Sequence, residues 1–239
     1  METIGKQEVW SFFDHQPRAR RVRDVSEVRH GPGHLVTSFI ELAMKIAELQ
    51  FRNREHVLLF RGQAKDYKDG KGLTILRPGI FRGRRASPSE IPGEQEIRRR
   101  FHKLAKAETE LVERYIADPV LRGDDDETSR LKRQRILRWS ILQHYEVCGT
   151  PLLDVTHSLR IAASLPSHGA NGQVFLFVLG IPNLSGAITA SAEAGLQIVR
   201  LSSVCPPSAV RPHLQEGYLL CEYPEIDLTN KRLTIEFVR

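Results

Sequence analysis

The sequence predicts an α+β domain, in which a mainly helical first half packs on a mixed or antiparallel sheet built mostly from the second half. Helical patterns dominate residues 34–147, whereas short runs rich in β-branched and aromatic residues, bounded by Gly, Pro and Asn, follow residue 150. Helices that come first and strands that come later are typical of α+β domains, because α/β domains alternate the two.

Composition limits the class of protein. The chain has 239 residues, of which 41% are hydrophobic and 27% charged, as is typical of a globular protein with a real core. No apolar run approaches the roughly 18 residues of a membrane span, and the N-terminus has no apolar signal segment. The three cysteines are widely spaced. These features predict a cytoplasmic protein with reduced thiols and no membrane partner.

Residues 1–32 are predicted to be a basic N-terminal arm that precedes a single domain at 33–239. The arm is rich in charged residues, and the sequence HGPGH at its end is typical of a break. The domain then begins with a helical pattern over 34–50, which places Leu35 and Phe39 on its inward face.

One strand and two further helices complete the first half. Val57–Phe60 is a short apolar run typical of a core strand. An irregular connector rich in Gly, Pro, Lys and Arg is expected over 66–92. Apolar residues at helical spacing predict a long helix over 93–117, and the acidic residues that follow it favour another helix over 130–147.

Five apolar segments of the second half are predicted to be strands. We expect the strand that ends at Phe60 to lie centrally in the sheet, adjacent to or near the strand that carries Asp154 and Thr156. The five segments are 150–156, 173–180, 196–201, 217–223 and 232–238.

Arg61 stands directly after the apolar strand and is followed by Gly62. Arginine is the side chain hardest to bury or discharge, so this placement has two explanations. Either the strand reaches the surface there, or the arginine binds an anion and Gly62 lets the ligand approach the backbone. Arg77 and Arg82 flank a Pro-Gly turn shortly afterwards and are further candidates for a phosphate site.

Two later segments carry polar residues that could join such a site. Because side chains alternate along a strand, Asp154 and Thr156 share one face, where they form either a buried polar site or an Asp-x-Thr helix cap. Gln215 and Glu216 lie on a turn just before a strand, and they belong either to the same site or to an ordinary polar loop.

The net charge of +6 and the pI near 9.4 favour partners that carry phosphate, such as a nucleotide or a nucleic acid. The basic residues are clustered, and each cluster is either a solvated face or part of a basic surface. The clusters are Arg18, Arg20, Arg21, Arg23 and Arg29; Arg82, Arg84 and Arg85; Arg98, Arg99 and Arg100; and Lys132, Arg133, Arg135 and Arg138.

Other chemistries have little support in the sequence. His144, Cys148 and His157 match no common zinc spacing, so we expect no metal site, and a nucleophilic pair of Cys148 and His144 is no better supported. The chain has no P-loop, no GxGxxG, no HExxH and no GxSxG.

Four separated motifs, in order, resemble the FRG domain. They are LLFRGQ, LRPGIFRG, QHYEVCGTPLLDVTHSLRIAASL and RPHLQEGYLL, and they cover roughly residues 57–220. The name of that domain denotes a sequence pattern, which implies no particular activity.

The same motifs also resemble arginine-first ADP-ribosyltransferases of the R-S-E type. In that family an aromatic-Arg pair ends one strand, a hydroxyl-bearing strand precedes an Ala-rich helix, and a Gln/Glu-x-Glu turn precedes a late strand. Phe60-Arg61, DVTHSLRIAASL and QEGYLL are similar to these three pieces. The resemblance implies an ADP-ribosyltransferase-like sheet and a set of residues that bind NAD, namely Arg61, Gly62, Gln63, Thr156, Ser158 and Gln215.

The resemblance further implies that Arg61 is part of the catalytic machinery together with one carboxylate. The position of the family's glutamate falls on Gly217, so either Glu216 or Asp154 has to serve. Cleavage of the nicotinamide–ribose bond passes through an oxocarbenium-like state, which a carboxylate stabilises.

The implied function is mono-ADP-ribosyl transfer from NAD. Charge favours RNA or single-stranded DNA as the acceptor over protein, with Arg82, Arg84 and Arg85 as nucleic-acid contacts. Such an enzyme would be toxic in its own cytoplasm, which is typical of a bacterial toxin or phage-defence effector held in check by an antitoxin protein. The alternatives are a non-catalytic module that binds a nucleotide or nucleic acid, and a transferase that modifies protein.

Overall fold

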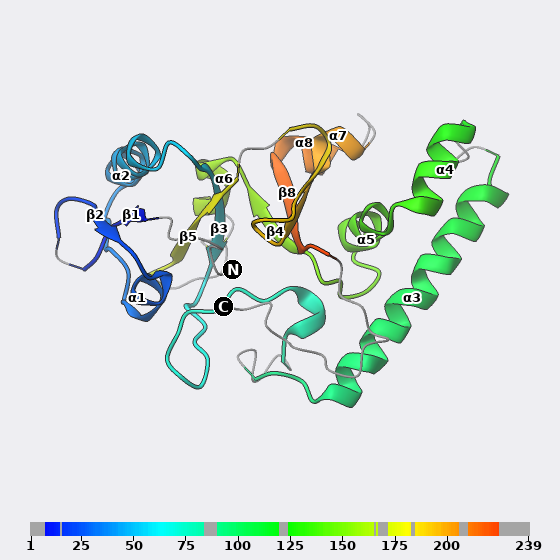
Figure 1. Ribbon diagram of the computed structural model, residues 1–239, viewed down its shortest axis with the longest axis horizontal. Helices are drawn as coiled ribbons and strands as arrows, with labels where there is room; N and C mark the ends of the chain where they lie inside the picture. Colours follow the sequence, from blue (N-terminus) through cyan, green and yellow to red (C-terminus); the bar gives the residue numbers. More distant parts are fainter. Residues whose placement is uncertain are drawn as a thin grey trace.

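The computed structural model describes residues 8–14, 16–83, 90–119, 124–164, 166, 172–182, 185–205 and 210–224 (Figure 1). Helices and strands of this part confirm an α+β fold. In chain order they are β1 (Val9–Ser11), β2 (Arg20–Val22), α1 (Val25–His30), α2 (Phe39–Arg52), β3 (Val57–Gln63), η1 (Gly79–Phe81), α3 (Glu94–Ala117), α4 (Asp125–Arg133), α5 (Arg135–His144), β4 (Leu153–Thr156), α6 (Leu159–Ser164), β5 (Phe175–Ile181), β6 (Ile188–Ser191), β7 (Leu196–Arg200), α7 (Leu201–Val204), α8 (Val210–Leu214) and β8 (Gly217–Glu222).

The main sheet has six strands in the order β5-β3-β4-β8-β7-β6, and all neighbours are antiparallel. The predicted adjacency of β3 and β4 is confirmed, and β3 lies inside the sheet, one strand from the β5 edge. The two neighbours of β3 are paired unequally, because every residue of β3 pairs with β5, whereas only Phe60 pairs with Thr156 of β4. Beyond Phe60, β3 and β4 therefore separate.

Helices cover one face of this sheet. Leu58 and Phe60 of β3 pack with Ala162 of α6 and with side chains of α2. Further along the same face, Leu219 and Val199 pack in a larger core with residues of η1, α3 and α5. Figure 1 shows this division, with α1 and α2 beside β3 and β5 and with α3, α4 and α5 beyond β4 and β8.

The other face of the sheet is concave. Leu59 of β3 and Ile181 of β5 belong to the same buried cluster as Leu196 and Ile198 of β7. Val57 of β3 and Thr189 of β6 line one pocket although three strands separate them in the sheet order, so the sheet is curved and its concave face buries a second core.

The first 32 residues contain ordered elements that contact α2. β1 and β2 form an antiparallel hairpin. The backbone N–H of Trp10 donates to Asn53 Oδ1 over 2.8 Å, and that of Ala19 donates to Glu48 Oε1 over 3.2 Å. Acidic residues also pair with the arginines here: Arg20 with Glu27, and Arg21 and Arg23 with Glu8.

Three sequence predictions about elements need comment. The helix expected over 34–50 begins only at Phe39, where Ser38 caps it, so Leu35 and Phe39 are 62% and 51% exposed rather than inward. The helix expected over 130–147 is two helices, α4 and α5, which break at Gln134. The predicted helix at 93–117 is confirmed as α3, and the predicted strand at 232–238 lies outside the described residues.

Candidate functional site

Arg61 is half-buried and held by two main interactions. Its Nη1 donates to the backbone oxygen of Asp154 over 2.5 Å, where β3 and β4 separate. Its Nε donates to the side-chain oxygen of Gln63 over 3.0 Å with the Gln63 amide in the orientation that satisfies both its oxygen and its nitrogen. Burial, reinforced by the positive charge of Arg82 and opposed by Asp154, lowers the pKa of Arg61 to about 10. The guanidinium is thus a fixed cation with N–H groups to spare.

Gly62 faces α6, not open space. A Cβ atom at Gly62 would lie 1.9 Å from the backbone oxygen of Ala162 and 2.8 Å from Pro166. The interpretation that this glycine lets a ligand approach is therefore wrong for this side of the strand. Its physical role is the close packing of α6 on β3.

Arg77 and Arg82 flank η1 on the connector that follows β3, and Arg82 lies near Arg61. Arg82 is exposed, and its Nε donates to the backbone oxygen of Arg77 over 2.9 Å. Arg77 is buried, and this burial lowers its pKa. Arg82 is close enough to influence the pKa of Arg61, so the two form a pair of neighbouring cations. Arg84 and Arg85 lie outside the described residues.

Thr156 is buried and ties β4 to the turn before β8. Its Oγ1 donates to the backbone oxygen of Gln215 over 2.6 Å and accepts from the backbone N–H of Ser158 over 2.9 Å. The bond to Ser158 N–H is the local cap that the sequence left as an alternative. Because its hydroxyl donates to the backbone oxygen of Gln215, Thr156 holds the turn before β8 in place.

Asp154 shares a face with Thr156, as expected, but its side chain is exposed. Leu153 and Val155, which alternate with these two positions along β4, belong to the same concave core as Leu59. Arg61 is two residues from Leu59 and so lies on the concave face, while the Asp154 side chain lies on the opposite one. Only the backbone oxygen of Asp154 contacts Arg61, which makes Asp154 the weaker candidate for the carboxylate.

Glu216 has a left-handed backbone, with φ of 45°, directly after α8. Helices commonly end with glycine in this conformation, because a left-handed backbone disfavours a side chain. A glutamate at this position is therefore strained. Its Oε2 lies 4.0 Å from Nδ1 of His157, and its backbone oxygen accepts from His157 N–H over 3.1 Å. At Gly217 a Cβ would meet Leu201 at 3.0 Å, so that position faces the core. Of the two, Glu216 is the one that reaches solvent.

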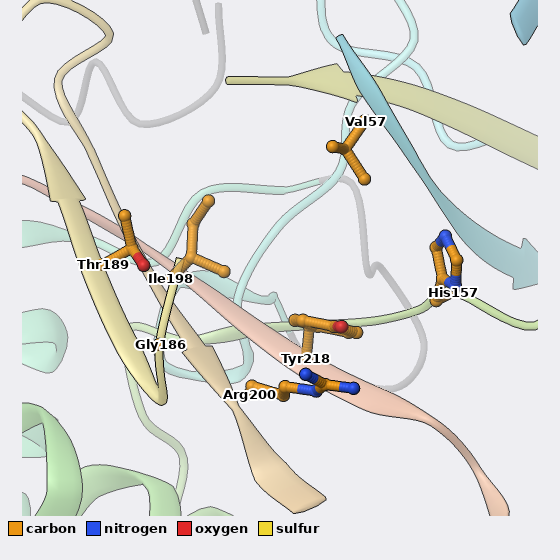
Figure 2. A pocket seen from close by; sticks show the side chains of 7 residues that line it. All are labelled: Val57, His157, Gly186, Thr189, Ile198, Arg200 and Tyr218. Carbon is orange, nitrogen blue, oxygen red and sulfur yellow. The ribbon is translucent and has the colours of Figure 1, made fainter. Parts of the chain in front are cut away.

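A pocket of about 220 Å³ opens on the concave face of the sheet (Figure 2). Val57 of β3 and Thr189 of β6 line it from strands that β4, β8 and β7 separate in the sheet order, with Ile198 beside Thr189. The remaining lining residues are Gly186, His157, Arg200 and Tyr218.

A smaller pocket of about 70 Å³ adjoins the first. Both are lined by His157, Arg200 and Tyr218, so they are two parts of one groove. The smaller part adds the polar residues Ser202, His213 and Glu216.

Glu216 is the predicted site residue that lines this groove, and Arg61 lines neither part. Sequence reasoning missed Arg200 and Tyr218, and it considered His157 only as a metal ligand. The local signal was a single arginine ending LQIVR and a single tyrosine opening YLL, and neither is distinctive without knowing which strands are neighbours.

Ion pairs neutralise much of the clustered basic charge. Arg98 pairs with Glu94, and Arg99 and Arg100 pair with Glu96. The buried carboxylate of Glu108 pairs with both Arg135 and Arg138. Together with the pairs of the N-terminal hairpin, these contacts leave fewer arginines available to an external anion than the sequence suggests.

Other site classes find no support in the described residues. No group of three or more His, Cys, Asp or Glu side chains there could hold a metal ion. Burial raises the pKa of Cys148 and of Cys205, which disfavours the thiolate that a nucleophile needs. Among the described helices, none combines the length and the apolar character that a membrane crossing requires.

Comparisons of the chain with protein-family models, with curated proteins and with solved structures found no match. The resemblances to the FRG domain and to ADP-ribosyltransferases therefore rest on the quoted motifs.

Proposed function

We propose that this protein is an NAD-dependent mono-ADP-ribosyltransferase whose site lies where β3, β4 and the turn before β8 meet. One observation carries the proposal: a chain of contacts joins three segments that are far apart in sequence. Arg61 binds the backbone of Asp154, and Thr156, two residues on, binds the Gln215–Glu216 turn. A fixed cation and a half-exposed carboxylate are thus connected through β4.

The residues fit a dinucleotide in chemistry and in span. Arg61 uses two of its N–H groups on the protein, so others remain for a bidentate contact with the diphosphate. Arg82 adds a second positive charge nearby. Glu216 precedes a strand that lies two positions from β3, which is about 10 Å at the usual strand spacing. An extended dinucleotide bridges that separation.

Glu216 would supply the catalytic carboxylate. When bound, NAD supplies the ADP-ribosyl group together with nicotinamide as the leaving group. The carboxylate of Glu216 would stabilise positive charge on the ribose as the glycosidic bond breaks. It would then accept the proton of the attacking acceptor group, and the imidazole of His157, at 4.0 Å, would orient it.

The acceptor that we propose is RNA or single-stranded DNA. The net charge of +6 favours a polyanion, and a single strand offers its bases without unpairing. Ion pairs of the N-terminal hairpin and of α3 neutralise many of the arginines that could otherwise contact a nucleic acid. The structural support for this acceptor therefore comes from exposed cations such as Arg82. A protein acceptor is the alternative within the same chemistry.

The direct test is incubation with NAD labelled on its adenylate phosphate and with separate pools of RNA, single-stranded DNA and protein. Wild type should release nicotinamide and label a nucleic-acid pool. Arg61→Ala and Glu216→Gln should each reduce release at least about 100-fold, in the range of a lost charge-stabilising group. Arg98→Ala, which removes an exposed arginine paired with Glu94, is the matched control and should retain activity.

A second candidate function is a non-catalytic module that binds a nucleotide or a nucleic-acid phosphate. The neighbouring cations Arg61 and Arg82, with the buried Arg77 between β3 and η1, favour it. This second function would be favoured if the wild type released no nicotinamide but bound a nucleotide, and if Arg61→Ala abolished that binding.

A further inference from the structure

Arg200 differs from most arginines of this protein, because its side chain has no hydrogen-bond or ion-pair partner within the described residues. Ten others in that part of the chain pair with a glutamate, among them those of the N-terminal hairpin, α3 and α5. Arg200 is exposed at the end of β7, where its backbone N–H donates to Ala187. A guanidinium without a partner beside a pocket is suited to an anionic ligand.

The groove gives this cation a defined setting. Arg200 and Tyr218 are register partners on neighbouring strands, so their side chains share the concave face. In Figure 2 both extend toward His157, and Val57, Thr189 and Ile198 line the rest of the larger pocket. The hydroxyl of Tyr218 also has no hydrogen-bond partner among the described residues. We call the larger pocket, which is lined in part by these apolar side chains, the chamber. The groove therefore combines a guanidinium, a phenol and this chamber.

The smaller part of the groove adds groups of a different kind. Glu216 is an acceptor for hydroxyl groups, and Ser202 and His213 lie along the same wall. A ligand that matches the whole groove carries an anion for Arg200, hydroxyl groups for Glu216 and a flat or apolar part for the chamber of about 220 Å³. A single nucleotide unit has all three.

We propose that this groove binds one nucleotide of the acceptor strand, with its phosphate on Arg200, its sugar beside Glu216 and its base in the chamber. The inference rests on the proposed function, because it takes Arg61 as the anchor for NAD. The strand order β3-β4-β8-β7 puts the strand that follows Glu216 between those of Arg61 and Arg200. The carboxylate thus stands between two phosphate-binding arginines, one for the donor and one for the acceptor.

The test compares two ligands and two arginines by equilibrium binding without turnover. The ligands are NAD and a 5′-phosphorylated uridine pentanucleotide, which contains no adenylate. Arg200→Ala should weaken pentanucleotide binding about tenfold or more, as expected for one lost charge-assisted contact, and leave NAD binding unchanged. Arg61→Ala should do the reverse. Arg211→Ala is the control, since it removes an exposed arginine of α8 that pairs with Glu146 and does not line the groove.

Three results would overturn the inference. In the first, the wild type does not bind the pentanucleotide. In the second, Arg200→Ala binds the pentanucleotide as tightly as the wild type does. In the third, Arg200→Ala loses as much affinity for NAD as for the pentanucleotide. Arg200→Gln repeats the measurement if the alanine variant unfolds. Nicotinamide release, measured separately, distinguishes this inference from the proposed function. If NAD is cleaved but the two arginine variants do not affect the two ligands in opposite ways, only the groove assignment is rejected. If the variants do so but no nicotinamide is released, only the transferase activity is rejected.

Discussion

The hydroxyl of Thr156 donates a 2.6 Å hydrogen bond to the backbone oxygen of Gln215, and this bond fixes the turn that carries Glu216 to the end of β4. The bond is partly buried, and Thr156 itself is only 6% exposed. A contact that is shielded from much of the solvent keeps its geometry because little water competes for either group. The position of the candidate carboxylate therefore depends on Thr156.

Thr156→Val should lower both stability and turnover. Valine has nearly the shape of threonine but leaves the oxygen of Gln215 and the N–H of Ser158 without partners. We expect a loss of about 1–3 kcal/mol in the free energy of unfolding, measured by urea denaturation. Because the turn loses its anchor, nicotinamide release should fall with little change in NAD affinity.

Thr156→Ser separates positioning from packing. Serine keeps the hydroxyl and loses only a methyl group, so it should restore most of the turnover while remaining somewhat less stable. Turnover that is as low in the serine variant as in the valine variant would show that the hydrogen bond is not what positions Glu216.

Glu216→Gly should raise stability while it abolishes turnover. Glycine removes the strain of a left-handed glutamate, which we expect to add up to about 1 kcal/mol to the free energy of unfolding. Glu146 is a matched control, since it also follows a helix and has φ of 54°. Glu146→Gly should stabilise the protein similarly and leave nicotinamide release intact. Full activity in Glu216→Gly would remove Glu216 from the mechanism.

Gly62→Ala should destabilise the protein by about 3 kcal/mol or more. The new methyl group would overlap the backbone oxygen of Ala162, which cannot move without displacing α6 from β3. Gly70→Ala is the control, because a Cβ there meets nothing within 4 Å. Thermal unfolding of the two variants measures the difference. If Gly62→Ala instead kept wild-type stability and lost only NAD affinity, the original interpretation of a ligand-facing glycine would be restored.

Short apolar runs and long helical periodicity were enough to predict the main elements. Val57–Phe60 was expected beside the Asp154 strand because the candidate site needs residues of both strands, and the pairing of Phe60 with Thr156 confirms that they are neighbours. The helix expected over 130–147 was wrong at its start, since Asp124 caps α4 through the backbone N–H of Glu127, and at Gln134, where no Gly or Pro announces the break.

The candidate site was predictable only in part. Arg61 and Glu216 were found because each interrupts an apolar pattern or precedes a strand. Arg200 and Tyr218 were not, because their proximity arises from the β7–β8 register, and a sequence pattern does not state which strands pair. The ion pairs of α3 could have been predicted from the spacing of Glu94 and Arg98, which lie four residues apart on one helix.

Arg82 should contribute to the salt dependence of nucleic-acid binding. It is exposed, and its side chain makes one hydrogen bond within the described residues, through Nε, so the rest of the guanidinium can face a phosphate. For a short single strand, binding should weaken steeply between about 50 and 200 mM salt. Arg82→Ala should reduce the slope of log affinity against log salt by about 0.7, the value for one phosphate contact on a single strand. Arg98→Ala should leave the slope unchanged, because Glu94 already neutralises that charge. Equal slopes for wild type and Arg82→Ala would remove Arg82 from the nucleic-acid surface, and the remaining basic residues would have to account for any binding.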